Sequence, residues 1–214
     1  MPIDYRSSSA DLSQREAFAR SRLARAYRHH VDRVVMASLP EARRCIDIGA
    51  GEVILLEKLR ARNGRAWLVA LDRHPENAAI AGRFGFPAIL ADAAALPLAA
   101  ESFDIAILNN MLEHVDDPHA VLVEARRILA PGGRAVVLVP HENNFRRARV
   151  LLGRRHEAGL DYGHVQDWDP ESLDRALRRA DLVPVARRNL PLPVWAGALH
   201  HLAIATRGPS SGIA

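Results

Sequence analysis

The sequence predicts an α/β protein built on a doubly wound, mostly parallel sheet. Three observations support this fold class. From residue 45 onward, short apolar runs alternate with segments of helical periodicity. Most of the runs are apolar throughout, as expected for parallel strands that helices cover on both faces. Acidic residues end three of the runs, at the edge where doubly wound sheets bind their ligands.

Residues 1–40 are expected to form a helical extension ahead of the sheet. Ser13 and Glu16 have the spacing of a capping box, and apolar side chains then recur at near-helical spacing. Leu39-Pro40 ends the pattern. The spacing therefore predicts one amphipathic helix over residues 13–39.

Residues 41–207 are expected to form one domain, followed by a flexible tail at 208–214. Asp117-Pro118 and Asp169-Pro170 each supply an N-cap and a proline for the first helical position. Strands are expected at residues 45–48, 66–71, 88–90, 103–108, 135–139, 182–186 and 201–206, and helices at residues 52–62, 75–83, 118–129 and 170–180.

Length and composition limit the partners and the compartment. The 214 residues fit one globular domain, and the net charge of +4 is spread along the chain, so a nucleic-acid partner is not expected. Cys45, in an apolar run, cannot form an internal disulfide. With a polar N-terminus and no transmembrane segment, a cytoplasmic protein is expected. Composition does not indicate the oligomeric state.

Three strand ends carry the residues of a candidate cofactor site. The segment Asp47-Ile48-Gly49-Ala50-Gly51 follows a strand and opens a helix, so its glycines can bring the backbone close to a ligand. A tight turn without a ligand is the alternative. Asp72 ends the next strand, where a carboxylate can accept both hydroxyls of a ribose, and Asp92 can accept from an adenine amine. Together they favour an adenosine-containing ligand.

These motifs belong to a longer pattern in continuous order. It comprises residues 45–51, Leu71-Asp72, residues 91–98, Glu101-Ser102-Phe103-Asp104, residues 109–115 (NNMLEHV) and residues 129–133. Over roughly residues 40–140 the chain resembles the class I S-adenosylmethionine methyltransferases, especially the small-molecule branch similar to ubiquinone and menaquinone biosynthesis enzymes. The resemblance implies a Rossmann-like, seven-stranded sheet with an antiparallel last strand. It also implies methyl transfer with S-adenosyl-L-methionine as cofactor.

The resemblance further implies a role for each cofactor-binding residue. Asp47 and the turn formed by Gly49, Ala50 and Gly51 would hold the amino-acid end of the cofactor. The other expected contacts are Asp72 with the ribose, Asp92 and Ala93 with the adenine, and Asn109 with the methionine portion.

Val53 departs from the family pattern, which often has a third glycine at this position. Its branched side chain is expected to crowd the cofactor or the helix–strand contact unless the turn shifts. A non-catalytic binding or regulatory protein that keeps the fold is therefore one alternative. A nicotinamide-dependent oxidoreductase is another, since it shares a glycine turn followed by an acid, but no Tyr-x-x-x-Lys pair is present and lysines are few.

Residues 141–168 are expected to form a substrate rim, because they follow the carboxyl end of the fifth strand. Arginines outnumber acidic residues over residues 141–160, which predicts an acidic or lipid-like small-molecule acceptor, with Arg146 and Arg147 as substrate contacts. A solvated helix face is the alternative. Tyr162 and His164, in a loop that can act as a lid, are the other substrate candidates.

His114 and His164 are the candidate catalytic bases, because an imidazole titrates near neutral pH. A base is needed only if the acceptor must lose a proton, and His114 can instead order its loop. Glu113-His114 resembles half of the Glu-x-x-Glu-His metal motif of some related methyltransferases, but Asn110 replaces the first glutamate. No metal ion is expected, since a hard divalent ion prefers several oxygen ligands.

Overall fold

The computed structural model describes residues 22–39, 41, 43–151, 153, 164–193 and 197–208. The helices are α2 (Arg22–Ser38), α3 (Ile54–Arg62), α4 (Pro75–Arg83), the 3-10 helix η1 (Leu112–His114), α5 (Pro118–Ile128), α6 (Glu142–Leu151) and α7 (Pro170–Arg179). The strands are β1 (Arg44–Ile48), β2 (Trp67–Asp72), β3 (Ala88–Leu90), β4 (Phe103–Asn109), β5 (Leu129–Pro140), β6 (Leu182–Leu190) and β7 (His200–Arg207).

All seven strands form one sheet in the order β3-β2-β1-β4-β5-β7-β6. Strands β1 to β5 pair in parallel, whereas β7 pairs antiparallel with both β5 and β6. The predicted α/β fold with a mostly parallel, seven-stranded sheet and an antiparallel last strand is confirmed. The order reverses beside β1, where ligands of doubly wound sheets bind.

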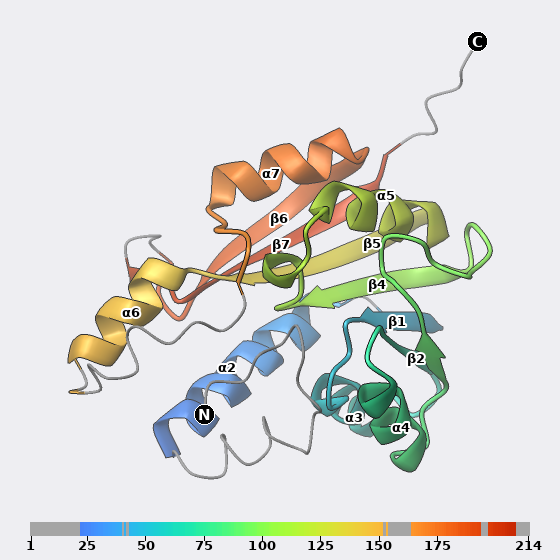
Figure 1. Cartoon of the computed structure of the whole chain (residues 1–214), viewed down its shortest axis with the longest axis horizontal. Helices are drawn as coiled ribbons and strands as arrows, with labels where there is room; N and C mark the ends of the chain where they lie inside the picture. The colour runs from blue at the N-terminus through green and yellow to red at the C-terminus, as the bar shows by residue number, and fades with distance from the viewer. Residues whose placement is uncertain are drawn as a thin grey trace.

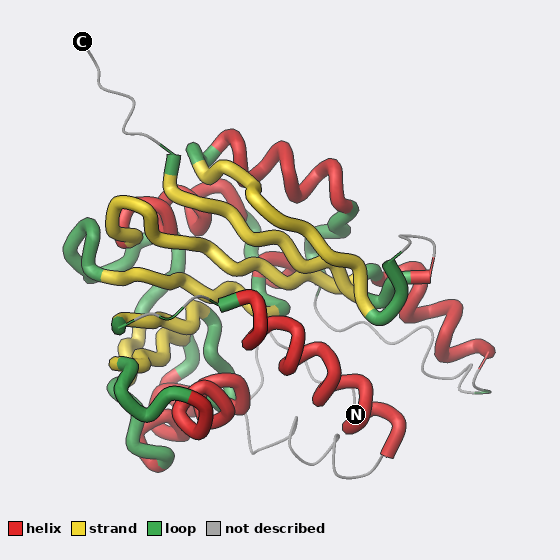
Figure 2. Tube along the Cα trace, turned by 180° about the vertical axis from the view of Figure 1, so that it is seen from behind, coloured by secondary structure: helices red, strands yellow, loops and turns green. Residues whose placement is uncertain are grey.

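Helices cover the sheet on both faces. Figure 1 shows α5 and α7 on one face and α2, α3 and α4 on the other, and Figure 2 shows the same layers from behind. Successive residues of a strand pack on opposite faces of the sheet, in two separate hydrophobic cores. Ile46 and Ile48 pack beneath α5 and α7, while Cys45 packs in the core beneath α2 to α4. Burial raises the pKa of the Cys45 thiol, which favours a packing role for this residue.

Helix α2 is fixed to the domain by apolar and charged contacts. Val31 and Val35 are buried in the core on its face of the sheet. Asp32 is buried as well and pairs with Arg28 at 2.8 Å and with Lys58 of α3. The helix can therefore place its N-terminal turns over the carboxyl ends of the strands. The predicted start at residue 13 lies outside the described residues.

The structure differs from the sequence expectation beyond the carboxyl end of β5. Helix α6 begins there and projects from the body of the protein (Figure 1). Strand β6 is also longer than predicted, because its polar half pairs with β7 at the exposed edge of the sheet. Of the predicted tail, only Gly208 is described. Among the described helices, none is both long enough and apolar enough to cross a membrane.

Candidate active site

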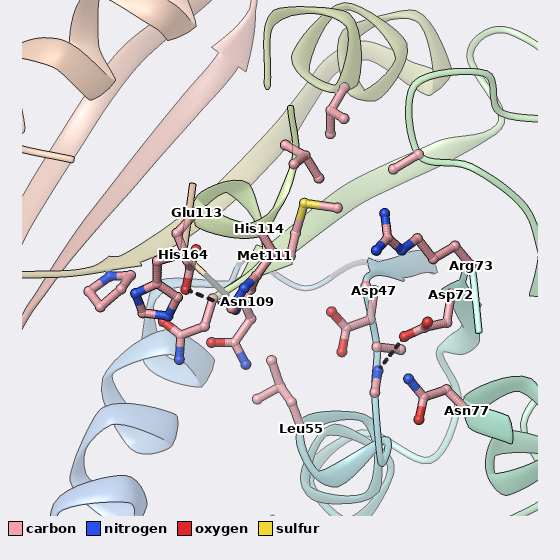
Figure 3. A pocket seen from close by; sticks show the side chains of 18 of the residues that line it. Asp47, Leu55, Asp72, Arg73, Asn77, Asn109, Met111, Glu113, His114 and His164 are labelled. Atoms are coloured by element: carbon pink, nitrogen blue, oxygen red, sulfur yellow. Dashed lines mark hydrogen bonds and ion pairs between the residues drawn. The ribbon is translucent and has the colours of Figure 1, made fainter. Parts of the chain in front are cut away.

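A cavity of about 630 Å³ lies where the carboxyl ends of β1, β2, β4 and β5 meet. Its size is in the range of small-molecule sites. Figure 3 shows acidic and amide side chains on one side of it and the histidine pair on the other, with Asn109 and Met111 between them. We refer to these sides as the cofactor half and the acceptor half.

The glycine turn closes the floor of the cofactor half. Gly49 has a φ of +77°, and a Cβ there would lie 2.9 Å from the Cβ of Met111, so a larger residue does not fit. The amides of Gly49 and Ala50 donate to the carbonyl of Leu71 at 2.8 and 3.0 Å. The turn after β1 is thereby tied to β2.

Asp72 is held at the end of β2 by two backbone amides. One carboxylate oxygen accepts from Gly51 N and the other from His74 N, both at 2.9 Å. Asp72 lines the cavity, and each oxygen keeps further capacity to accept hydrogen bonds. This geometry fits a partner with two hydroxyls.

One further acid and one amide line the outer part of the cofactor half. Asp92 is exposed at the cavity edge and accepts from Ala94 N at 2.9 Å, and the buried Ala93 lies beside it. Asn77 of α4 also lines the cavity, and its buried Oδ1 has no hydrogen-bond partner among the described residues. Asn77 has no sequence signal of its own, because a single amide within a helix belongs to no motif.

Asp47 is a buried carboxylate with an oxygen atom that is unpaired within the described part of the chain. It is 2% exposed, and its Oδ1 has no hydrogen-bond partner among the described residues. Burial raises its pKa to about 7, and Arg28 of α2, which also lines the cavity, opposes this shift. The Oδ1 atom of Asn109, which lines the same cavity, is likewise buried without a hydrogen-bond partner in the part of the chain that the structure describes. Such groups fit a ligand that brings a positive charge and donors.

Val53 lies outside the cavity lining. Its side chain is fully buried in the core beneath α2 to α4, and its backbone is left-handed with a φ of 54°. Helix α3 therefore begins at Ile54 rather than at residue 52. The valine strains the backbone by about 1–2 kcal/mol but leaves the cavity open.

The acceptor half brings His114 and His164 together. Their rings meet edge to face with centroids 4.7 Å apart. The Val165 amide donates to the Glu113 carbonyl at 2.8 Å, which holds the segment after residue 163 against η1. His164 Nδ1 lies 3.1 Å from Glu142 Oε2, and this contact keeps the pKa of Glu142 below its usual value. Glu142 was not identified from the sequence, because it lies beside His164 only through the position of α6.

Glu113, His114 and His164 are close enough to meet one metal ion, with ligand atoms that all lie within 4.8 Å of one another. Glu113 is buried, which raises its pKa to about 7. The set offers two nitrogens and one oxygen, unlike the oxygen-rich sites of hard divalent ions. The absence of a metal ion stays a prediction.

The other residues predicted to contact the substrate do not all line the cavity. Arg146 and Arg147 are exposed on α6 and do not line the cavity, whereas Arg149 on the same helix does. Tyr162 lies outside the described residues. Trp168 packs against the core beneath α5 and α7. Three rings that the sequence analysis did not identify, Tyr27, Phe145 and His200, also line this half.

Comparison with known proteins agrees with this geometry. A family model described as a methyltransferase domain matches residues 18–187. The chain belongs to this methyltransferase family. It is an S-adenosylmethionine-dependent methyltransferase, and the nicotinamide alternative is set aside.

The related proteins include enzymes of quinone synthesis. The chain is 32% identical over 170 residues to the ubiquinone biosynthesis O-methyltransferase of Cereibacter sphaeroides, covering 74% of this chain and 68% of that protein. Against the enzyme of the same name from Xanthomonas oryzae, identity is 33% over 150 residues, covering 65% and 62%.

Solved structures share the fold. An S-adenosylmethionine-dependent methyltransferase from Thermotoga maritima superposes with a TM-score of 0.72 at 22% identity, covering 93% of this chain and 97% of that one. The geranyl diphosphate C-methyltransferase of Streptomyces coelicolor gives 0.68 at 15% identity, covering 84% and 80%. At these identities the likeness establishes the fold.

Proposed function

We propose that this methyltransferase acts on an oxygen atom of a small-molecule acceptor. The observation that carries the proposal is the His114–His164 pair in the acceptor half of the cavity, with Glu142 at 3.1 Å from His164. A hydroxyl must lose its proton as it is methylated, and an imidazole is the side chain best suited to accept it. The two related enzymes named above are O-methyltransferases, which also supports oxygen as the acceptor atom.

The residues of the cofactor half fit S-adenosylmethionine. Asp47, buried and with an unsatisfied oxygen, suits the α-ammonium group, and Arg28 beside it suits the carboxylate. Asp72 suits the ribose hydroxyls, Asp92 and Ala93 suit the adenine, and Asn109 suits the methionine portion. The turn formed by Gly49, Ala50 and Gly51 allows close approach of the backbone.

The chemistry needs a positioned acceptor and a place for one proton. The bound cofactor supplies a methyl group on a positively charged sulfur: the carbon–sulfur bond breaks, an oxygen–carbon bond forms, and a neutral thioether leaves. The protein holds the acceptor oxygen in line and excludes water. His164 or His114 takes the proton, and Glu142 stabilises the imidazolium if His164 does so.

The acceptor is proposed to be a small molecule with an acidic or lipid-like part. Arg149 lines the cavity and can pair with an acidic group, while Arg146 and Arg147 would act at the entrance. Tyr162 stays a candidate substrate contact on sequence grounds. A cytoplasmic location stays part of the proposal, since Cys45 is buried as a free thiol.

A pH–rate profile with His114→Gln and His164→Gln tests the proposal, using hydroxylated and amine acceptors side by side. Calorimetric titration with S-adenosylmethionine is the control for an intact cofactor half. We expect loss of the acidic limb in one variant, with cofactor affinity retained. Near-normal turnover in both variants contradicts a histidine base and leaves positioning alone as the mechanism.

The absence of a metal ion is tested on the same protein. Turnover should be unchanged after treatment with a chelator and after addition of Mg²⁺ or Zn²⁺. Loss of activity on chelation, restored by one of these ions, would replace the histidine base with a metal site at Glu113, His114 and His164.

A further inference from the structure

The far wall of the acceptor half consists of three rings from distant parts of the chain. Tyr27 comes from α2, Phe145 from α6 and His200 from the start of β7, and all three line the cavity. Tyr27 stacks on His200 with centroids 5.7 Å apart and planes 29° apart. Phe145 meets the same imidazole edge to face at 5.0 Å. The imidazole is therefore packed against two aromatic rings.

This wall is uncharged. Burial, with a smaller contribution from Arg28, lowers the pKa of His200 to about 3, so the imidazole is neutral at neutral pH. Burial raises the pKa of Tyr27, which therefore keeps its hydroxyl proton. The rings thus face the cavity as a neutral aromatic surface, unlike the carboxylate of Glu142, whose pKa lies below its usual value.

One hydrogen bond fixes the proton of the imidazole. The Tyr27 hydroxyl lies 2.7 Å from His200 Nδ1, and its other acceptor, the Leu190 carbonyl, is farther away at 3.5 Å. The hydroxyl has one hydrogen to donate, and assigning it to the shorter contact makes Nδ1 the acceptor. A neutral imidazole carries one proton, so that proton is then on Nε2. His200 therefore has one donor left for a ligand.

We propose that Tyr27, Phe145 and His200 form the subsite for a planar aromatic ring of the acceptor, with His200 Nε2 donating a hydrogen bond to a ring oxygen. Aromatic walls bind planar rings by stacking and edge contacts. The donor selects rings that carry an oxygen in addition to the one that is methylated. This inference rests on the proposed function and names the residues that orient its substrate.

The test measures ring binding separately from cofactor binding and turnover. Full-length protein saturated with S-adenosylhomocysteine is titrated with catechol, with phenol and with the non-planar cyclohexane-1,2-diol. We expect catechol to bind about five- to tenfold more tightly than phenol, since it makes one additional hydrogen bond, and the non-planar diol to bind weakest. His200→Leu should reduce catechol affinity more than phenol affinity, so that the five- to tenfold preference for catechol disappears.

Further variants keep the test decisive if His200→Leu does not fold. His200→Gln, whose amide nitrogen replaces Nε2, should keep the preference for catechol. Tyr27→Phe removes the hydroxyl that fixes the imidazole proton and should reduce that preference about threefold. Phe145→Leu should weaken both aromatic probes by a similar factor. Val150→Ala, on the exposed side of α6 and outside the cavity lining, is the matched control and should change nothing.

The outcomes separate this inference from the proposed function. Binding of S-adenosylhomocysteine without binding of either aromatic probe would overturn the ring subsite and leave methyl transfer intact. Equal affinity for catechol and phenol in the wild-type protein would overturn the role of His200. Failure to bind S-adenosylhomocysteine would overturn the proposed function and this inference with it.

Discussion

The two halves of the cavity differ in how the chain builds them. In the cofactor half, Asp47, Asp72 and Asn109 end neighbouring parallel strands, and each is placed by its own strand. In the acceptor half, Tyr27, Glu142 and His200 come from two helices and the last strand. Their positions depend on how α2, α6 and β7 pack together.

From this difference we expect the two halves to tolerate substitutions differently. The cofactor half is held by short backbone ties, such as the Gly51 amide to Asp72 at 2.9 Å. The acceptor half depends in addition on contacts between side chains, such as Tyr27 to His200 at 2.7 Å. We therefore expect the cofactor half to bind one ligand in a fixed way, and substitutions in the acceptor half to change specificity while the fold persists.

The largest expected effect tests the cofactor half. Asp72→Ala should weaken S-adenosylmethionine affinity by roughly 1.5–3 kcal/mol, because charge-assisted hydrogen bonds to the ribose are lost. Isothermal calorimetry measures the change. Asp92→Ala, at the exposed edge of the same half, is the matched comparison and should have a smaller effect. Unchanged affinity in the Asp72 variant would remove this residue from the site.

Asp47→Asn should separate stability from binding. Burial raises the pKa of Asp47 from 3.8 to about 7, so the folded protein holds this proton more tightly than the unfolded chain. The free energy of unfolding should therefore fall as pH rises from about 4 to about 7. In Asp47→Asn the free energy of unfolding should not show this decrease with pH. At pH 8 the variant should be more stable than the wild-type protein by roughly 1–3 kcal/mol.

The same variant should bind the cofactor more weakly. In the wild-type protein, affinity should decrease below about pH 7, because the ammonium group of the cofactor needs the ionised carboxylate. This pH dependence should be absent in Asp47→Asn. Chemical denaturation and calorimetry across pH 5–8 measure both effects, and a variant with wild-type pH dependence would show that another group titrates.

Substitutions on α6 test which of its arginines contact the acceptor. Arg149→Gln, in the cavity lining, should raise the acceptor KM about tenfold, since a charge-assisted contact is lost. Reversal of Arg146 and Arg147 to glutamate should raise it about threefold through the local potential, and less at high salt. Steady-state kinetics measure the acceptor KM of each variant, and the affinity for the cofactor is the control. Equal effects would mean that the exposed face of α6 binds the acceptor directly.

Val53→Gly should have the smallest effect. Removing the valine relieves about 1–2 kcal/mol of backbone strain and loses roughly 1.5–3 kcal/mol of burial, so the protein should be destabilised by about 1 kcal/mol. Cofactor affinity should stay within twofold, because the side chain lies in the core. A large gain in affinity would instead support an impaired cofactor site in the natural chain.

The sequence was most informative where chain order and spatial order coincide. The run from Asp47 to Asn109 predicted the strands and their polar ends, because parallel strands bring their carboxyl ends to one edge. Tyr27 and His200 were not identified, since two ring residues so far apart in sequence carry no local signal. Arg146 and Arg147 were distinguished from Arg149 only when α6 fixed which side of the helix faces the cavity.

The position of β7 has a consequence for the order of assembly. This strand fills the gap between β5 and β6, although it is made after both of them. During synthesis, one edge of β5 stays unpaired until residues 200–207 leave the ribosome. Until then β6 has no neighbouring strand in the sheet. Because His200 is the first residue of β7, the ring wall is completed at the same moment. A nascent chain halted before this point would hold the cofactor residues of β1 and β2 but would have no far wall for the acceptor.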